Sequence, residues 1–165
     1  MTRVYIALGS NVEPRARLSQ AARLLRAQFP GIRFSACHQN VAIGFAGADF
    51  INAAAGFDTT LTLPQLVAVL HRIEEQCGRS RADAKWAPRA MDLDVLLYGD
   101  LVSDTPPARV PRADLLRRAY MLGPISELAP GLSHPVVRRT LAELWAGLAP
   151  HTPPLTLVAL DLNLS

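Results

Sequence analysis

The residues best suited to chemistry are two aspartates, Asp92 and Asp94, within a short apolar segment. On a β-strand, residues two apart point to the same face, so both carboxylates would lie side by side. The residues that alternate with them would fill the other face: Leu93, Val95 and Leu97. Adjacent carboxylates repel each other unless a cation lies between them, and hard oxygen ligands suit Mg²⁺. The pair predicts a metal site, with a water-facing edge strand as the alternative.

A run of basic residues immediately precedes the two aspartates, and it comprises Arg79, Arg81, Lys85 and Arg89. Cationic side chains beside a divalent-metal site are what polyphosphate chemistry requires, because the charge on the phosphate oxygens must be neutralised. A loop of this kind can also close over a nucleotide and exclude water. We therefore predict a phosphate-binding loop, and the alternative is an ordinary solvated run of charges.

Three further features are weaker candidates, and no standard nucleotide-binding fingerprint accompanies them. The segment Gly9–Asn11 follows an apolar stretch, where it is either a simple turn or a place for backbone N–H groups to face a ligand. Asn52 offers a donor and an acceptor that match the amide-like edge of a heterocycle, unless the backbone satisfies it. His71 and Glu74 are helical neighbours, by default a surface pair.

The elements that must position these residues alternate along the chain. Hydrophobic patterning predicts strands over residues 4–8, 32–38, 50–58 and 92–98. It predicts helices over residues 14–29 and from a capping box at Thr62 and Gln65 to Gly78. The order β-α-β-β-α-β indicates an α+β fold with a ferredoxin-like core, in which helices pack on one face of an antiparallel sheet.

The C-terminal third extends this core. A helix is expected around residues 115–128, and a second capping box at Thr140 and Glu143 opens another. Residues 155–162 read as an edge strand or as a loosely attached tail. We expect a single domain over residues 1–165, in which the role of residues 150–165 stays open.

Composition narrows the function classes. Half of the 165 residues are apolar and 19% are charged, and no apolar run approaches the length of a membrane span. Two cysteines, Cys37 and Cys77, exclude a disulfide framework and favour a reducing, cytoplasmic setting. The basic segments 79–89 and 109–118 together carry more than the net charge of +3, so the remainder is acidic. This distribution favours a local anionic ligand over nucleic acid or a membrane, and we expect a monomer.

Several motifs together resemble the 6-hydroxymethyl-7,8-dihydropterin pyrophosphokinase family of folate biosynthesis. They are VYIALGSN at 4–11, DFINAA at 49–54, RIEEQCGR at 72–79, KWAPRAMDLDVLLYG at 85–99 and, more weakly, VPRADLLRRAYML at 110–122. The resemblance implies transfer of a pyrophosphoryl group from ATP to the hydroxymethyl oxygen of a dihydropterin, with release of AMP.

The resemblance also implies a role for each matching residue. Asp92 and Asp94 would hold two Mg²⁺ ions, and Arg79 and Arg89 would be catalytic. The residues on the nucleotide side would be His71, Glu74, Arg81, Trp86, Val95, Arg109 and Arg112. The residues on the pterin side would be Gly9, Asn40, Ile43, Phe50, Asn52, Arg118 and Tyr120.

The chain departs from the family pattern at a few of these positions. Arg112 stands where the family has a phosphate-contacting histidine, Phe50 stands where tyrosine is common, and the segment 40–44 differs. These changes keep open a paralogue that acts on a modified pterin. A non-catalytic ferredoxin-like binding module is the third hypothesis, although such a module has no need of the paired carboxylates at Asp92 and Asp94.

Overall fold

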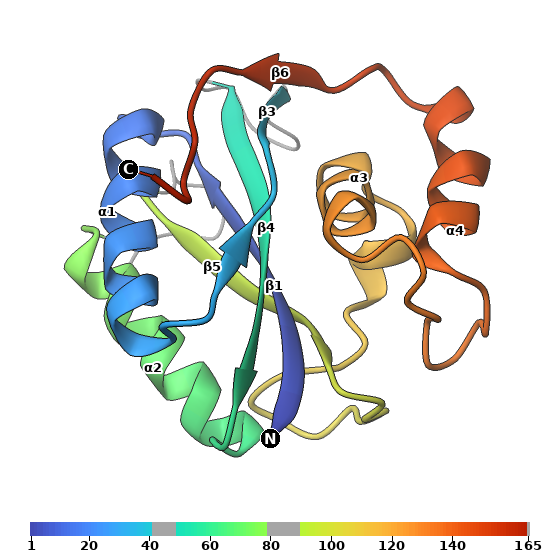
Figure 1. The fold of residues 1–165 in the computed structure, drawn as a ribbon, viewed down its shortest axis with the longest axis horizontal. Helices are drawn as coiled ribbons and strands as arrows, with labels where there is room; N and C mark the ends of the chain where they lie inside the picture. The colour runs from blue at the N-terminus through green and yellow to red at the C-terminus, as the bar shows by residue number, and fades with distance from the viewer. Residues whose placement is uncertain (41–48, 79–89, 165) are drawn as a thin grey trace.

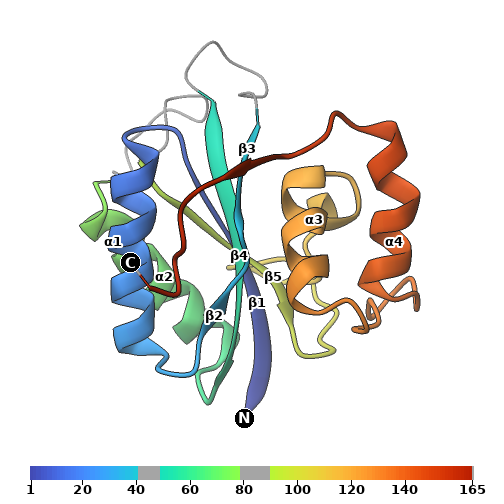
Figure 2. The same ribbon diagram turned by 45° about the horizontal axis from the view of Figure 1, so that its top comes forward.

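An antiparallel β-sheet lies at the centre of the fold, and helices cover both of its faces (Figures 1 and 2). The computed structural model describes residues 1–40, 49–78 and 90–164. Within them the strands are β1 (Thr2–Ser10), β2 (Arg33–Phe34), β3 (Cys37–Asn40), β4 (Phe50–Thr59), β5 (Asp92–Tyr98) and β6 (Thr156–Val158). Neighbouring strands follow the order β5-β1-β4-β3-β6, and β2 also pairs with β4. The expected α+β class with an antiparallel sheet is confirmed.

The helices form two layers. The layer on one face contains α1 (Pro14–Gln28) and α2 (Leu63–Gln76), and the layer on the other contains α3 (Ala119–Leu128) and α4 (Leu141–Leu148) (Figure 2). Short 3-10 turns, Ala113–Leu116 and Ala149–His151, precede α3 and follow α4. Both predicted capping boxes are present, at Thr62 with Gln65 and at Thr140 with Glu143, so each helix begins where its sequence signal lies.

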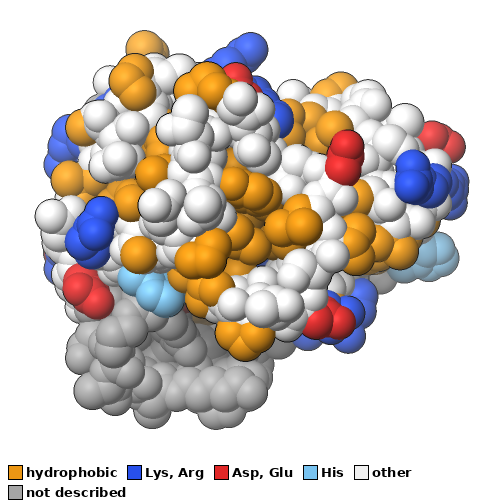
Figure 3. Space-filling model, turned by 90° about the horizontal axis from the view of Figure 1, so that it is seen from below, with side chains coloured by type: hydrophobic (Ala, Val, Ile, Leu, Met, Phe, Trp, Pro, Cys, Tyr) orange, Lys and Arg blue, Asp and Glu red, His pale blue; other side chains and the backbone are white. Residues whose placement is uncertain are grey.

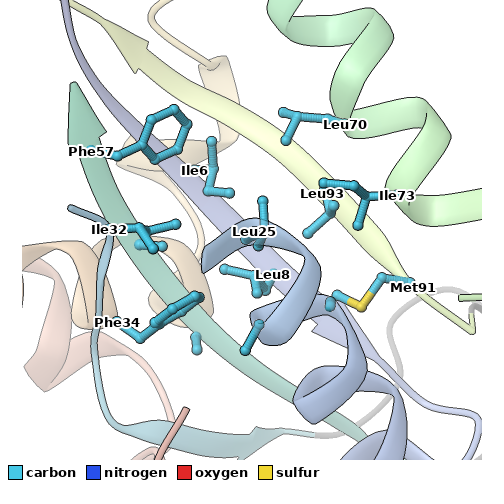
Figure 4. Packing of buried hydrophobic residues seen from close by; sticks show 14 of the residues in the cluster. Ile6, Leu8, Leu25, Ile32, Phe34, Phe57, Leu70, Ile73, Met91 and Leu93 are labelled. Atoms are coloured by element: carbon cyan, nitrogen blue, oxygen red, sulfur yellow. The ribbon is translucent and has the colours of Figure 1, made fainter. Parts of the chain in front are cut away.

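Each helical layer encloses its own hydrophobic core. The first core lies between the sheet and the helices α1 and α2, where Ile6, Leu8, Leu25, Phe57 and Leu93 converge (Figure 4). The second core lies on the opposite face and includes Tyr5, Ala7, Ala54, Leu96 and Leu122. The expectation that the helices pack on one face holds only for α1 and α2, because the C-terminal helices bury apolar residues on the other face.

Two predicted elements are each divided in the structure. The strand expected over residues 32–38 is split into β2 and β3, because Ser35 and Ala36 lie outside the regular pairing with β4 and the Ala36 N–H points away from that strand. The Ser35 N–H donates to the Ala54 carbonyl at 2.8 Å, and the Ala36 N–H donates to the Glu127 carboxylate at 2.7 Å. The helix expected around residues 115–128 is likewise interrupted, because Arg118 is extended and serves as the N-cap of α3.

Strand β5 departs from regular alternation at a β-bulge. Tyr5 of β1 pairs with Leu97, whereas the next residue of β1 pairs with Val95, so Leu96 is the extra residue. Beyond the bulge the faces exchange: Leu97 lies in the second core and Tyr98 packs against the first. The expectation that Leu97 shares a face with Val95 was therefore wrong, while Asp94, before the bulge, keeps its predicted face.

The C-terminal segment is attached to the sheet edge. Strand β6 pairs with β3, in a register that sets Val158 opposite Cys37 and Thr156 opposite Gln39. Of the two options that the sequence left open for residues 155–162, the edge strand is confirmed for Thr156–Val158. Among the described residues, no helix is both long and apolar enough to cross a membrane.

Candidate active site

A row of polar residues crosses the sheet on the face that α3 covers. In the register of the central strands, Gly9 of β1 lies between Asp92 of β5 and Asn52 of β4. His38 of β3 is the next residue in this row, opposite Asn52. Residues paired across neighbouring strands share a face of the sheet, so the carboxylate and the amide both stand beside the bare backbone of Gly9.

Gly9 is required at the centre of this row because the side chain of Asn52 lies over it. A Cβ atom on residue 9 would be 2.7 Å from the Asn52 Oδ1 atom, a separation that real Cβ atoms do not tolerate. Asn52 is buried, and its Nδ2 amide donates to the Oδ1 atom of Asn40 on β3. Two residues further along the strands, Asn40 pairs with Phe50 on the same face. The absence of a side chain at Gly9 thus leaves the space in which the Asn52 amide lies.

A cavity of about 150 Å³ lies between helix α2 and strand β5, and Asp94 forms part of its wall. Five residues predicted from the sequence for the nucleotide or the metal line it: His71, Asp94, Val95, Arg109 and Arg112. The sequence reasoning missed the apolar part of its wall, which includes Val67, Leu70, Leu93, Pro107 and Ala108. The apolar stripe of helix α2 is the signal that could have indicated Val67 and Leu70.

Arg112 joins this cavity to the aspartate pair. Its Nη1 atom is 3.5 Å from Oδ1 of Asp94, and both side chains are partly exposed. Its backbone N–H donates to the carbonyl of Leu96, the bulged residue of β5, at 2.9 Å. Its Nε atom is buried and has no hydrogen-bond partner among the described residues. Because a buried N–H without a partner is costly, this atom is suited to bind an anionic ligand.

Glu74 has a different environment from the one that the sequence suggested. Its side chain is only 2% exposed, and its Oε2 atom accepts a hydrogen bond from the Leu93 N–H at 2.8 Å. The interpretation of His71 and Glu74 as a surface pair was therefore wrong for Glu74, although His71 is exposed. Glu74 ties α2 to β5 at the residue between the two aspartates, so it fixes the strand that carries them.

A larger cavity, of about 490 Å³, lies at the end of β3 and α3. Three of the predicted pterin residues line it: Asn40, Arg118 and Tyr120. Burial raises the pKa of the Tyr120 phenol above its ordinary value. The sequence reasoning missed the rest of the wall, in which five consecutive residues belong to the C-terminal segment, namely Thr152, Pro153, Pro154, Leu155 and Thr156.

Not every predicted site residue can be placed. Ile43, Arg79, Arg81, Trp86 and Arg89 lie outside the described residues. Arg109 lines the smaller cavity and forms an ion pair with Asp104, with 2.9 Å between its Nε atom and Oδ1.

The acidic donors near the site are few. Within residues 1–40, 49–78 and 90–164, no group of three or more His, Cys, Asp or Glu side chains is arranged to hold a metal ion. Asp92 and Asp94 are a pair of oxygen donors, a set that suits Mg²⁺ completed by water and substrate phosphates. On the face shown in Figure 3, basic side chains stand apart around the rim and hydrophobic ones gather near the middle.

The geometry so far places Asp94 in the wall of one cavity, beside Arg112, and places Asn40 and Tyr120 in the wall of a second one. The sequence from residue 5 to 130 matches the family described as 7,8-dihydro-6-hydroxymethylpterin-pyrophosphokinase (HPPK). The chain belongs to this family, and the resemblance stated from the motifs is confirmed.

Curated relatives carry the same description. The chain is 40% identical to the 2-amino-4-hydroxy-6-hydroxymethyldihydropteridine pyrophosphokinase of Pseudomonas aeruginosa, over 87% of this chain and 90% of that one. It is also 40% identical to the enzyme of that name from Methylorubrum extorquens, over 87% of this chain and 94% of the relative. The corresponding protein of Aquifex aeolicus is 32% identical, over 87% and 90%.

Solved structures share the fold. Crystal structures of Plasmodium falciparum HPPK-DHPS superpose on this chain with TM-scores of 0.70 for the complex with pteroate and 0.72 for the complex with STZ-DHP. Both matches cover 91% of this chain, which spans 43% and 42% of those longer chains. At 12% and 13% identity the likeness concerns the fold alone.

Proposed function

We propose that this chain performs its family's reaction, pyrophosphoryl transfer from ATP to the hydroxymethyl group of 6-hydroxymethyl-7,8-dihydropterin, on the sheet face described above. The observation that carries the proposal is the row in which Gly9 separates Asp92 from Asn52. Adjacent strands are about 4.8 Å apart, so the carboxylate and the amide are separated by roughly 10 Å. That span suits a flat heterocycle whose reactive substituent extends from Asn52 toward the aspartates.

In this proposal Asp92 and Asp94 hold Mg²⁺, two ions by analogy with the family. The donor chemistry supports the assignment, because two partly buried carboxylates share one face of β5. When bound, the metal would neutralise charge on the phosphate oxygens. The chain's own part is to fix both carboxylates, which the bond from the Leu93 N–H to Glu74 supports.

The nucleotide would bind in the cavity between α2 and β5. Its apolar wall, with Leu70 and Val95, suits a purine ring, and Arg112 lies where the phosphates would approach Asp94. The partnerless Nε of Arg112 supports a role in phosphate binding. Arg79 and Arg89 are proposed as catalytic residues from the family motif.

The pterin would bind beside Asn52 and Asn40. A pterin presents an edge of alternating donors and acceptors, which a side-chain amide complements. The rings of Phe50 and Tyr120 would supply flat walls on either side. Gly9 leaves room for the Asn52 side chain, and Arg118, in the wall of the cavity with Asn40 and Tyr120, adds a positive charge.

We also propose that the core is ferredoxin-like. The order β5-β1-β4-β3, with every neighbour antiparallel and helices α1 and α2 on one face, supports this assignment. A monomer, without nucleic-acid or membrane partners and in the cytoplasm, remains the expectation from the sequence.

The test is an assay of AMP release from MgATP with and without 6-hydroxymethyl-7,8-dihydropterin. Release that depends on the pterin supports the proposed reaction. If ATP is bound but no pterin-dependent AMP forms, the non-catalytic binding module gains support. If AMP forms only with a substituted pterin, the chain is a paralogue with a modified substrate.

Asn52→Ala separates the two substrate sites. We expect it to weaken pterin binding with little effect on the nucleotide, because a buried unpaired edge costs about 1–3 kcal/mol. Calorimetric titration of the pterin, in the presence of an unreactive ATP analogue and Mg²⁺, measures this effect. Unchanged pterin affinity would show that the pterin site lies elsewhere.

A further inference from the structure

The C-terminal strap, defined here as residues 152–164, bridges the two helical layers. In Figures 1 and 2 it runs from α4, past the end of α3, along the edge of β3 and on to α1. It follows residue 130, where the family match ends. Although the strap lies beyond the family match, five of its residues line the cavity of about 490 Å³ together with Asn40, Arg118 and Tyr120.

The strap is fixed to the core at its far end. Asn163 brackets Phe34, because its Oδ1 atom accepts from the Phe34 N–H at 2.9 Å and its Nδ2 group donates to the Phe34 carbonyl at 3.0 Å. Arg15 of α1 donates to the Ala159 carbonyl at 3.0 Å, and Leu162 is fully buried in the first core. These contacts hold residues 159–163 firmly, so the preceding residues have a defined course.

The near end of the strap packs on α3. A Cβ atom on Gly123 would be 2.7 Å from Cδ1 of Leu155, so Leu155 lies directly against the helix backbone. Gly123 is one turn from Tyr120 on α3. Two residues beyond Leu155, Leu157 is 69% exposed and pairs with His38. The strap therefore touches both elements that border the cavity, α3 through Leu155 and β3 through β6.

We propose that the strap is a positioning element of the pterin site. It sets the distance between β3, which carries Asn40, and α3, which carries Tyr120, and its residues Pro153–Thr156 close the outer side of the cavity between them. The inference rests on the proposed function, since it assigns the strap to one of the two substrates. The nucleotide cavity contains no strap residue, so an effect of the strap should be confined to the pterin.

Leu155→Ala is the variant that tests this role, and Leu157→Ala is its matched control on the same segment. We expect Leu155→Ala to weaken pterin binding on the order of tenfold, because a cavity wall that is less well fixed is less well preorganised for its ligand. Affinity for an unreactive ATP analogue should stay unchanged. Leu155→Met conserves volume and should restore pterin affinity, and Leu157→Ala should match the parent protein.

Titration of both ligands, together with thermal unfolding, separates the possible outcomes. A loss confined to the pterin, restored by Leu155→Met, supports the proposal. Parent-like pterin affinity in Leu155→Ala overturns it, and so does an equal loss for both ligands, which would mean a general structural role. If Leu155→Ala does not fold, Pro154→Gly, an exposed change that loosens the strap, decides by the same criteria. The parent protein's pterin-dependent AMP release is measured first, so failure of the proposed function is recognised separately.

Discussion

Replacing Gly9 by alanine should weaken pterin binding without altering the fold of the sheet. The added Cβ would be 2.7 Å from Oδ1 of Asn52 and 3.8 Å from the ring of Phe50, so the amide of Asn52 must move. Its contact with Asn40 would then be lost or distorted. A buried amide left without a good partner costs about 1–3 kcal/mol, equivalent to roughly 5- to 150-fold in the dissociation constant.

The measurement is calorimetric titration of the pterin in the presence of an unreactive ATP analogue and Mg²⁺. Gly56→Ala is the matched control, because its Cβ would be 2.7 Å from Cε1 of Tyr5, a clash of equal severity on the same sheet. That clash lies four residues along β4 from Asn52. We expect Gly56→Ala to lower stability and to leave the pterin affinity of the folded protein unchanged.

A double-mutant cycle tests the cause. If Gly9→Ala acts by displacing Asn52, it should add little to the effect of Asn52→Ala, because the shortened side chain no longer occupies the space. Penalties that add fully would refute this reasoning, as would a Gly9→Ala protein that binds the pterin as tightly as the parent.

Three further predictions concern other parts of the molecule. Asp94→Asn should lower Mg²⁺-dependent AMP formation by about 10²–10³-fold with no loss of thermal stability, and near-normal turnover would contradict the metal assignment. Glu74→Ala should lower the free energy of unfolding by about 1–3 kcal/mol because the buried Leu93 N–H loses its acceptor; urea titration measures this, and Glu74→Gln, which keeps an oxygen, should lose less. Burial raises the pKa of Cys37 to about 11, so at neutral pH its thiol should react about a hundredfold more slowly than one with the ordinary value of 9.0, as peptide-resolved thiol labelling would show. The Cys37 thiol ionises at a lower pH in the unfolded chain than in the folded protein, so its contribution should lower the free energy of unfolding as pH rises from about 9 to 11. A free energy of unfolding that does not change over this range would contradict the prediction.

Local signals predicted most of the framework. The apolar run that begins at Val4, the capping box at Thr62 and the strand at Asp92 depend on neighbours in the sequence, and each lies where the pattern indicated. The aspartates and Asn52 share a face because alternation holds along β4 and along β5 up to the bulge.

Long-range contacts account for what the sequence did not reveal. The burial of Glu74 depends on its bond to Leu93, and no pattern along α2 distinguishes it from an exposed glutamate. The break at Ser35 depends on a carbonyl of β4. Leu155 joins the wall of a cavity through contact with a glycine on α3, which only the folded chain brings near.

The bulge at Leu96 has a consequence for length variation in β5. Deleting Leu96 would preserve the cross-strand partners of Asp92, Asp94 and Leu97, so the ladder itself would tolerate the loss. The carbonyl that receives the Arg112 N–H would vanish with it, however. The bulged residue thus accepts the backbone hydrogen bond that holds Arg112, which is distant in sequence, beside Asp94. Leu96 is also fully buried in the second core, so a regularised strand would lose that packing as well as release Arg112.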